Sequence, residues 1–401
     1  MTPLHISSRR FLLDLAELAT FGRRQDGGID RVAGSAADLA SRAWIRERIE
    51  ACGLSSWADD TGNVFGRRGD SRGPWLLVGS HTDTVPGGGY LDGAYGVIAA
   101  LEVLRVLHEA DHPAADMLEI VSFWDEEGAQ ATSTGGLVGS TALCAGGHIE
   151  SIAGYLELHI EQGPRMEAAE LELAAVSGIV GVARYSVTMQ GVANHGGTTP
   201  MLGRADAGQA AVKAAAQIID LVTALDPDMV ANLGFIEFEP GAPNVIPGRA
   251  EFVVEFRAGT EQALRTVRRR LEQLVQRSAE AENCSGTVEQ ISYKPVARFD
   301  PALCHTVEMS LRTVAPAVGR LLSYAGHDAS VLSRYVPTAM VFVPSTGGIS
   351  HAPDEYTPEP LLVQGAQALL QCVLAVHASA SSPRGAELVP QTTPGVHSRP
   401  R

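Results

Sequence analysis

Cysteine is scarce in this sequence, and the five that occur form no recognisable pattern. Cys52, Cys144, Cys284, Cys304 and Cys372 are odd in number, far apart and without a C-x-x-C pair. A disulfide framework pairs its cysteines and usually holds an even number of them, so this arrangement argues against one. We therefore expect reduced, buried thiols, as in a cytoplasmic protein.

Basic residues are too few for some classes of function. The 401 residues include 31 Lys and Arg against 46 Asp and Glu, a formal net charge of −15. Nucleic acids and anionic membrane surfaces attract proteins through excess positive charge. We therefore expect neither as a partner and interpret the negative charge as an aid to solubility.

Long apolar runs are also lacking. No apolar stretch reaches the roughly 20 residues that a transmembrane helix needs, and residues 1–10 have no signal-peptide core ahead of Arg9 and Arg10. We expect a soluble, cytoplasmic protein. What the chain does have is a normal globular composition, 45% hydrophobic, which is enough for one large domain or two.

The first informative stretch runs from Trp75 to Asp92. An apolar run over residues 75–78 is followed by His81 and Asp83, and a glycine-rich loop leads to Asp92. A buried strand that ends in this way puts an imidazole and a carboxylate where ligands bind in open α/β sheets. Both groups bind zinc, manganese and similar metals. Alone, this histidine could equally be a structural residue.

Three more apolar runs are each followed by side chains of the same kinds. Each side chain has a structural alternative: an acidic helix start, a core histidine or a loop histidine. Four such runs together predict one shared site at the carboxyl ends of the strands. The runs and side chains are residues 117–123 with Glu126 and Glu127, residues 152–158 with His159, and residues 338–343 with His351.

These side chains supply the parts of a two-metal hydrolytic site. Asp92, in its glycine-rich loop, is the predicted bridging ligand. His81 and His159 would complete one metal site, and Glu127 and His351 would complete the other. The sequence leaves the metal open between Zn, Mn, Co and Ni.

Two neighbouring carboxylates have predicted supporting roles. Asp83 lies two residues after His81, so its carboxylate would hydrogen-bond the ligand imidazole. Glu126, beside the predicted ligand Glu127, is the predicted general base, with a pKa set by burial and by the metals.

The middle of the chain has a different pattern. Residues 182–295 predict the order β-α-β-β-α-β of a ferredoxin-like unit. We therefore predict an α/β fold: a mixed-sheet catalytic domain flanked by helices, residues 1–181 and 296–380, with an inserted α+β domain at residues 182–295. Residues 381–401 are rich in Ser, Pro, Gly and Thr and are predicted to be a disordered tail.

Hydrophobic periodicity predicts the individual elements. In the catalytic domain we expect helices at residues 7–20, 36–51 and 96–110 and a short strand and turn at residues 54–65. In the inserted domain we expect strands at residues 182–190, 229–238, 249–256 and 286–293, and helices at residues 204–224 and 260–281.

At the predicted site the chain resembles the M20-type amidohydrolases, in particular their hydantoinase/carbamoylase branch. That branch includes N-carbamoyl-L-amino acid hydrolases, β-ureidopropionases and allantoate amidohydrolases. Aminoacylases and peptidases of the wider family usually carry a carboxylate where this chain has His159, so residues 158–164 indicate the branch. The similar segments are Gly79–Pro86, Asp92–Gly93, Asp125–Gly128, Glu157–Pro164 and Gly348–His351.

The resemblance assigns roles that the residues alone would not. It implies that the inserted domain is a lid and dimerisation domain, that the protein is a homodimer, and that His195 reaches the partner subunit's active site to stabilise an oxyanion. Gln162, Asn244 and Arg257 would contact the substrate, with Arg257 gripping a carboxylate, and His327 would lie near the site. Without the resemblance, a surface histidine, a turn asparagine and an exposed arginine are the simpler interpretations.

The resemblance also implies an activity. We expect a binuclear enzyme, with two divalent ions per subunit (Zn or Mn; Co or Ni as alternatives), that hydrolyses a linear amide C–N bond. The favoured substrate is an N-carbamoyl-L-amino acid, giving the amino acid, carbon dioxide and ammonia. Allantoate hydrolysis, N-acyl amino acid or dipeptide hydrolysis, and a binding protein without catalysis are the alternatives.

The chain departs from the family at three places close to the expected substrate. Gly128 is followed by Ala-Gln-Ala, whereas relatives usually have Gly-x-Arg-Phe, with x any residue. His195 is followed by Gly-Gly, where many relatives have Ala-Gly. Tyr324 replaces a small residue or another aromatic. None of these residues is a predicted metal ligand. The departures therefore leave the identity of the substrate undecided and do not affect the expected mechanism.

Overall fold

The computed structural model describes residues 3–69, 71–131, 133 and 135–381. Apart from Ser381, the predicted tail lies outside the described residues. The chain divides into two compact units, which are described separately here. The first holds the residues up to Ser177, Phe299–Leu321 and the residues from His327 onward; the second holds Gly178–Arg298 and Leu322–Gly326.

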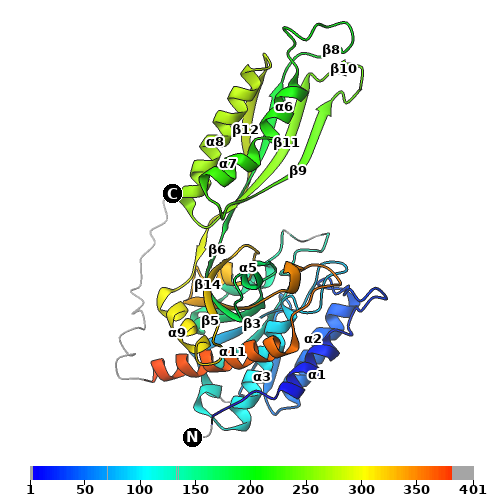
Figure 1. Ribbon diagram of the computed structural model, residues 1–401. Helices are drawn as coiled ribbons and strands as arrows, with labels where there is room; N and C mark the ends of the chain where they lie inside the picture. The colour runs from blue at the N-terminus through cyan, green and yellow to red at the C-terminus, as the bar shows by residue number, and fades with distance from the viewer. Residues whose placement is uncertain (1–2, 70, 132, 134, 382–401) are drawn as a thin grey trace, which may run out of the picture. The chain divides into compact units, whose positions relative to one another are not determined.

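The first unit is built on a mixed sheet, as predicted (Figure 1). The strands of this sheet are β1 (Ser55–Ala58), β2 (Val64–Arg67), β3 (Trp75–His81), β4 (Leu118–Phe123), β5 (Ile152–Ile160), β6 (Leu173–Ile179), β13 (Ala297–Arg298), β14 (Val318–Ser323) and β15 (Thr338–Val343). β13 and the last two residues of β6 and of β14 belong to the second unit. They lie in the order β1-β2-β4-β3-β5-β15-β6-β13, and β14 pairs with β6.

The four central strands are parallel. β3 runs parallel to β4 and β5, and β15 runs parallel to β5, whereas β2 and β6 add antiparallel neighbours on either side. β3, β4 and β15 are buried along their whole length. Strands covered on both faces read as continuous apolar runs, which is why these three were visible in the sequence.

Helices cover the sheet of the first unit. They are α1 (Ser8–Leu18), α2 (Ala36–Glu50), α3 (Ala94–Glu109), α4 (Val138–Ala145), α5 (Arg165–Ala168), α9 (Pro301–Leu311), α10 (Ala329–Leu332) and α11 (Glu359–Ala380), with short 3₁₀ turns η1 (Pro113–Met117), η2 (Gly147–Ser151) and η3 (Thr346–Gly348). α3 packs on β3, β4 and β5 and is buried from Ala94 to Leu107, so its sequence is apolar on nearly every side. Ser7 caps α1, as its position predicted.

One expectation about membranes needs correction. Among the described residues, α11 is long and apolar enough to cross a bilayer, although the sequence was expected to contain no such stretch. In the structure α11 packs against α3, α9 and β15, and Leu369, Leu370 and Val373 are completely buried. These contacts are those of a core helix in a globular protein.

The predicted strand and turn at residues 54–65 is a hairpin of two strands, β1 and β2. Asp59 organises its turn, because Oδ1 of Asp59 accepts hydrogen bonds from the main-chain N–H groups of Thr61, Gly62 and Asn63. The second strand runs from Val64 to Arg67, so it extends two residues beyond the predicted end at residue 65.

The second unit is a four-stranded antiparallel sheet in the order β12-β7-β11-β9, with helices on one face. Its elements are β7 (Gly181–Gln190), β8 (Asn194–His195), α6 (Ala207–Ala215), α7 (Ile218–Leu225), β9 (Val230–Glu239), β10 (Val245–Ile246), β11 (Arg249–Ala258), α8 (Glu261–Glu280) and β12 (Ser285–Lys294). The single helix predicted at residues 204–224 is thus two helices, because the N–H of Gln217 bonds the carbonyl of Ala214 and tightens the chain between them.

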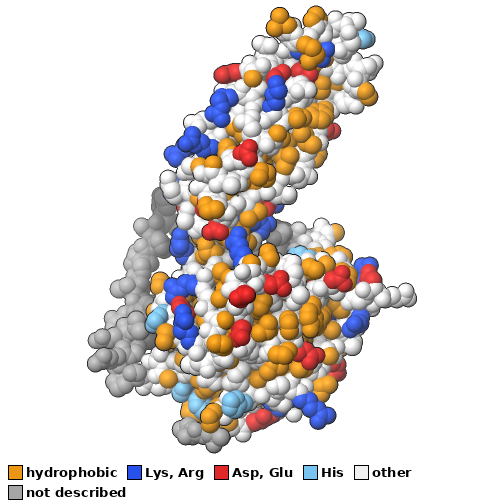
Figure 2. Space-filling view, in the orientation of Figure 1, with side chains coloured by type: hydrophobic (Ala, Val, Ile, Leu, Met, Phe, Trp, Pro, Cys, Tyr) orange, Lys and Arg blue, Asp and Glu red, His pale blue; other side chains and the backbone are white. Residues whose placement is uncertain are grey.

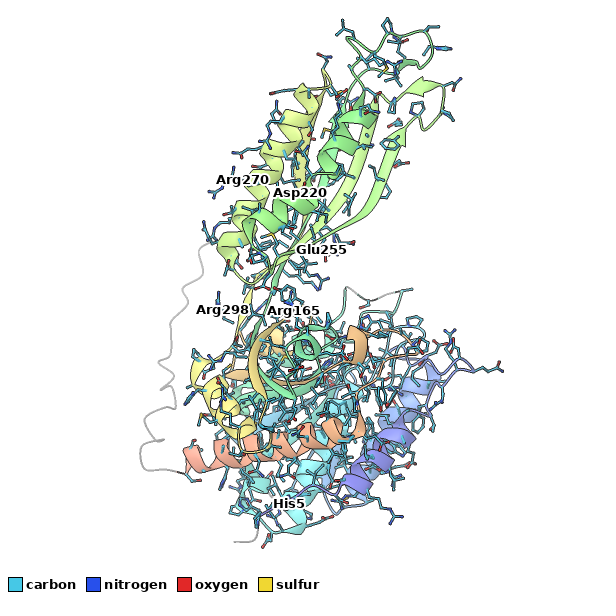
Figure 3. The ribbon with its side chains drawn as sticks, in the orientation of Figure 1. His5, Arg165, Asp220, Glu255, Arg270 and Arg298 are labelled. Atoms are coloured by element: carbon cyan, nitrogen blue, oxygen red, sulfur yellow. The ribbon has the colours of Figure 1, made fainter. Side chains whose placement is uncertain are left out.

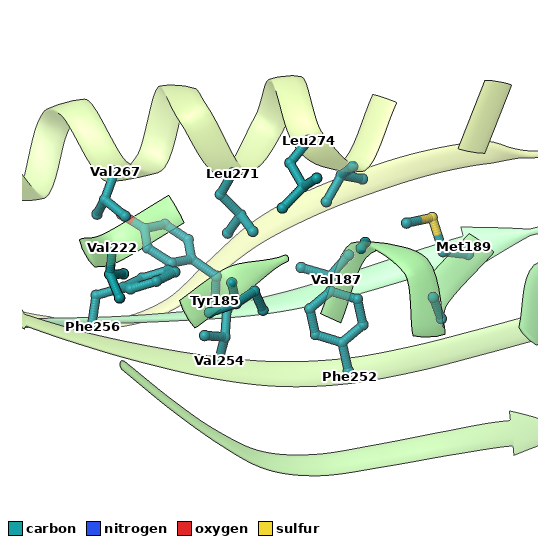
Figure 4. Packing of buried hydrophobic residues seen from close by; sticks show 14 of the residues in the cluster. Tyr185, Val187, Met189, Val222, Phe252, Val254, Phe256, Val267, Leu271 and Leu274 are labelled. Carbon is teal, nitrogen blue, oxygen red and sulfur yellow. The ribbon is translucent and has the colours of Figure 1, made fainter. Parts of the chain in front are cut away.

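Alternation along the strands builds the core of this unit. On β11, Ala250, Phe252, Val254 and Phe256 are buried under the helices, and the residues between them are partly exposed. Figure 4 shows Phe252, Val254 and Phe256 with Leu271 and Leu274 of α8. The period of two on the strands and the apolar stripe on α8 are the patterns that the sequence displayed.

Candidate active site

The four parallel strands bring the predicted residues to one edge of the sheet. β3 ends at His81, Glu126 and Glu127 follow β4, His159 lies at the end of β5, and His351 lies in the loop after β15. The carboxyl ends of neighbouring parallel strands necessarily share an edge. Residues that are up to 270 positions apart in sequence (81 to 351) therefore become neighbours.

The first group consists of His81, Asp92 and His159, all almost fully buried. Oδ1 of Asp92 lies 3.5 Å from Nε2 of His81 and 3.1 Å from Nε2 of His159. Gly93 makes this packing possible: a Cβ on Gly93 would lie 2.4 Å from the ring of His81, and its φ of 64° is left-handed.

Main-chain carbonyl groups determine which nitrogen each histidine presents. Nδ1 of His81 lies 3.0 Å from the carbonyl oxygen of Asp83, and Nδ1 of His159 lies 2.9 Å from that of Ile160. A carbonyl oxygen only accepts, so Nδ1 is the donor in both rings. The Nε2 lone pairs therefore face the carboxylate of Asp92, an arrangement that calls for a cation between them.

The second group consists of Asp92, Glu127 and His351. Nε2 of His351 lies 3.0 Å from Oδ2 of Asp92 and 3.4 Å from Oε1 of Glu127. Oε1 of Glu127 is buried without a hydrogen-bond partner among the described residues. A buried carboxylate oxygen without a partner is unfavourable unless it binds a cation.

The two groups share Asp92 and together offer imidazole nitrogen and carboxylate oxygen atoms. This donor set fits divalent metals such as zinc or manganese. A third group, formed by Glu157, His159 and His327, also has ligand-type atoms close together. Both oxygens of Glu157 are already hydrogen-bonded, however, to Ser80 Oγ and to the N–H of Ala329, so the first two groups are the better candidates.

Asp83 lies beside His81. Its Oδ1 atom is 3.6 Å from Nδ1 of that ring, and its main-chain oxygen is closer, at 3.0 Å. The carboxylate also accepts hydrogen bonds from the main-chain N–H groups of Glu126 (3.4 Å) and Glu127 (3.2 Å). It therefore orients the loop that carries both glutamates.

Glu126 lies beside the first group but belongs to neither. Its Oε2 atom is 3.7 Å from Nε2 of His81, and its side chain is largely buried. Burial raises the pKa of Glu126 well above its ordinary value, although His81 acts in the opposite sense. A carboxylate with a raised pKa beside a metal-type group has the properties of a general base.

The pKa values of the surrounding ligand-type groups are also shifted. Burial and the neighbouring Asp92 raise the pKa of Glu127 to about 7. Burial opposes ionisation of Asp92, but His159, His351 and His81 hold the pKa of Asp92 well below its usual range. The hydrogen bond to Asp92 raises the pKa of His351 to about 9.

Arg42 is a supporting residue that the sequence analysis missed. It is buried on α2 and donates to the carbonyl groups of Ser122 (3.3 Å) and Phe123 (2.8 Å) at the end of β4. It also pairs with buried Asp38 at 2.9 Å, and its guanidinium lies over the ring of Trp124. Arg42 thus holds the strand end from which Glu126 and Glu127 extend.

Gln162 and His327 lie at the first unit's site. Nε2 of Gln162 donates to Oδ2 of Asp92 at 2.8 Å, and Gln162 has a left-handed φ of 58° that turns it toward this carboxylate. His327 is 1% exposed, with its ring centroid 4.5 Å from that of His159. Burial and His159 lower the pKa of His327 well below its usual value.

In the second unit, a two-stranded sheet brings His195 and Asn244 together. His195 pairs with Val245, and the N–H of Gly196 donates to the carbonyl of Asn244. The N–H groups of Gly197 and Thr198 both donate to Nδ1 of His195, at 3.0 and 3.1 Å. Nδ1 therefore carries no proton, and Nε2–H is an exposed donor.

Arg257 lies at the other end of this unit, on β11. It donates to Oε1 of Glu255 at 2.8 Å and to the carbonyl of Tyr324 at 2.5 Å; Figure 3 labels Glu255. Burial of Glu255 is outweighed by its hydrogen bonds to Arg184 and Arg257, which lower its pKa. Tyr324 donates its hydroxyl to the carbonyl of Asp228, so this departure from the family pattern adjoins Arg257.

The fold and the site define an α/β protein with a candidate divalent-metal centre at the carboxyl ends of its parallel strands. Residues 77–375 match peptidase family M20/M25/M40, and the chain belongs to this family. The resemblance expected from the sequence is thereby confirmed.

Relatives of known activity cover almost the whole chain. Allantoate amidohydrolase of Bacillus subtilis is 31% identical over 399 residues, 91% of this chain and 97% of that protein. N-carbamoyl-L-amino-acid amidohydrolase of Paenarthrobacter aurescens is 29% identical, over 94% of this chain and its own full length. The crystal structure of a hydantoinase/carbamoylase family amidase from Burkholderia ambifaria is similar with a TM-score of 0.85 at 31% identity, covering 93% of this chain and 98% of that one.

Proposed function

We propose that this protein is a metal-dependent amidohydrolase that cleaves the carbamoyl group of an N-carbamoyl-L-amino acid, releasing the amino acid, carbon dioxide and ammonia. The observation that carries this proposal is the sharing of Asp92 by two ligand-type groups, with Glu126 beside them and outside both. Relatives with this activity cover nearly the whole chain.

His81, Asp92 and His159 would hold one divalent ion, and Asp92, Glu127 and His351 a second. When bound, such ions polarise the substrate carbonyl and make water more acidic. Glu126 accepts the proton of the attacking water and passes it to the leaving nitrogen, a task suited to its raised pKa. Asp83 and Arg42 keep Glu126 in place during these transfers.

Gln162 and Arg257 are the proposed contacts that orient the substrate. A guanidinium can grip a carboxylate through two parallel hydrogen bonds. Arg257 already donates to Glu255, so a substrate carboxylate would share this arginine with Glu255. Nε2–H of His195, fixed as a donor, would stabilise the oxygen that gains negative charge.

The geometry of the second unit supports a site completed by two copies of the chain. Asn244 directly precedes β10, five residues before the start of β11, and Arg257 lies near the end of β11. The eight steps from Arg249 to Arg257 along this strand span about 27 Å at about 3.4 Å per residue. Because a small ureido acid is much shorter, Asn244 and Arg257 of one copy cannot both contact it. We therefore propose a homodimer in which His195 and Asn244 serve the partner's site.

An exposed sheet edge supports the same proposal. β9 is the edge strand of the second unit and exposes Val230, Leu233, Phe235 and Ile236 by 40% or more. Hydrophobic side chains gather over the β9 side of this unit in Figure 2. An apolar edge strand is a template for pairing with another chain, and here the proposed occupant is β9 of a second copy.

Hydrolysis of allantoate is the second candidate function. Relatives named for it, such as that of Bacillus subtilis, are as similar as the carbamoylases. The same residues would act on a ureido group in both cases, so the second carbamoyl group of allantoate is the chemical difference.

Ammonia release by metal-reconstituted protein tests the proposal. N-carbamoyl-L-amino acids, allantoate and an N-acetyl amino acid would be compared after loading with manganese, zinc or cobalt. We expect strong release from an N-carbamoyl-L-amino acid and no cleavage of the acetyl compound. Activity on allantoate alone would select the second candidate, and activity on the acetyl compound alone would reject both.

A further inference from the structure

Glu355 is a buried carboxylate that no step of the proposed mechanism uses. It lies in the loop after β15, four residues beyond His351, and is 2% exposed. Its Oε1 atom accepts hydrogen bonds from the main-chain N–H groups of Leu91 (2.9 Å) and Asp92 (3.0 Å). Its Oε2 atom accepts one from the hydroxyl of Ser350 (2.8 Å).

These three bonds connect two loops that are distant in sequence. One loop carries Asp92, which both ligand groups share, and the other carries His351. Ser350 directly precedes His351. One oxygen of the Glu355 carboxylate therefore holds the main chain at Asp92, and the other holds the side chain of the residue next to His351.

The Asp92 loop is shaped to admit this carboxylate. A Cβ on Gly89 would lie 2.1 Å from Oε1 of Glu355 and 2.4 Å from its Cβ. Only glycine at position 89 therefore lets the loop approach closely enough for the two main-chain bonds. No Lys or Arg of the described part of the chain forms an ion pair with Glu355, so its bonds to the two loops are what compensates its burial.

We propose that Glu355 is a positioning residue that aligns Asp92 and His351 for the second metal ion. This inference rests on the proposed function, because it assumes two bound ions. His81 and His159 are oriented by the carbonyl groups of Asp83 and Ile160, one or two residues further along the chain, and not by Glu355. Loss of Glu355 should therefore weaken the Asp92–Glu127–His351 group far more than the other.

The test is a metal titration of the full-length, metal-stripped protein with zinc against a coloured chelator, which reports the number and affinity of bound ions. We expect two ions in the parent protein. Glu355→Ala should keep one at the parent affinity and bind the other roughly 10- to 100-fold more weakly, the usual effect of removing a residue that orients a ligand. Glu355→Gln should recover most of this loss, since its amide oxygen accepts from both N–H groups and its nitrogen donates to Ser350.

Two further variants complete the design. Asp354→Asn, on the exposed neighbour of Glu355, is the matched control and should bind both ions like the parent. Ser350→Ala removes one arm of the connection and should weaken the second ion by a smaller factor; it also serves as the test if Glu355→Ala does not fold by circular dichroism. Two ions at parent affinity in Glu355→Ala, or in Ser350→Ala where only that variant folds, would overturn the inference.

The same titration separates this inference from the function on which it rests. His351→Ala, measured in parallel, should lose the second ion outright. If the parent protein binds fewer than two ions, or if His351→Ala binds as many as the parent, the proposed two-ion function fails. If His351→Ala loses an ion and Glu355→Ala does not, only the role of Glu355 fails.

Discussion

The two buried histidines of the first group are oriented by main-chain atoms only one or two residues further along the chain. Nδ1 of His81 bonds the carbonyl of Asp83, and Nδ1 of His159 bonds that of Ile160. Such short-range contacts depend on the local backbone alone. This is why histidines at the ends of two apolar runs could be identified as a pair of candidate ligands before their distance was known.

Glu126 provides the first prediction at this scale. Glu126→Gln should lower kcat by roughly 10²- to 10⁴-fold, because the amide cannot accept a proton from water. Metal content should stay at the parent value, since Glu126 belongs to neither ligand group. Turnover and bound metal would be measured on the same samples, with Glu127→Gln as the comparison that should lose metal. A Glu126→Gln protein with parent activity would exclude this residue as the base.

His195 provides the second prediction at the scale of single residues. Two main-chain N–H groups occupy its Nδ1 atom, so it can act only by donating from Nε2. His195→Ala should reduce kcat by about 10²- to 10³-fold, the usual effect of losing one oxyanion donor, with a smaller change in KM. His195→Gln, which keeps a donor, should recover part of the loss.

The matched control for His195 is His305→Ala, an exposed histidine on α9. It should leave both kinetic constants unchanged. Equal kcat in His195→Ala and His305→Ala would contradict a donor role for His195.

At the scale of elements, the end of β4 decides where the two glutamates lie. Its carbonyl groups are held by Arg42 of α2, and the loop beyond it is held by the Asp83 carboxylate. Arg42 was not predicted, because a helix residue with an apolar surround gives no sign in sequence of the strand end that it will contact.

Arg42→Met tests this arrangement. It leaves the buried carboxylate of Asp38 without its partner, which should lower the free energy of unfolding by about 3–5 kcal/mol. A displaced Glu126 should also reduce kcat by up to roughly 10²-fold. Both would be measured, by denaturant unfolding and by turnover of the folded protein.

Two further variants serve as controls for Arg42→Met. Arg46→Met, on the same helix with an exposed side chain, should change stability by about 1 kcal/mol or less. Asp38→Asn added to Arg42→Met should recover part of the stability, because the unpaired charge is removed. If Arg42→Met were as stable and as active as Arg46→Met, the connection between α2 and β4 would be unimportant.

At the scale of the whole molecule, the proposed homodimer would bring His195 and Asn244 to the partner's site. Arg257 lies near the end of β11, whereas Asn244 precedes this strand and bonds Gly196, the neighbour of His195, in a separate two-stranded sheet. A contact between two copies through β9 would give each site the residues that its own second unit cannot supply.

Mixing two inactive variants tests this directly. In a heterodimer of Glu126→Gln and His195→Ala subunits, one of the two sites regains both residues. Random exchange of equal amounts makes about half of the dimers mixed, so about a quarter of the parent activity should return. Ammonia release after exchange, with native mass spectrometry to prove mixing, measures this; proven heterodimers without activity would place His195 in the site of its own chain.

The sequence by itself determined the local features of this protein. Apolar runs identified the parallel strands, and the polar residues at their ends identified the ligand-type groups, because both depend on neighbours along the chain. It did not reveal that α6 and α7 are separate helices, or that the Asp83 carboxylate also accepts hydrogen bonds from the main-chain N–H groups of Glu126 and Glu127.

Only the tertiary structure decided the long-range features. It placed Glu355 against Leu91 and Asp92, more than 260 residues away, and Arg42 against the end of β4. It also separated Arg257 from Asn244 along β11. Buried hydrogen bonds of this kind depend on which segments the fold brings together, and a carboxylate or guanidinium in a loop or helix carries no local mark of its distant partner.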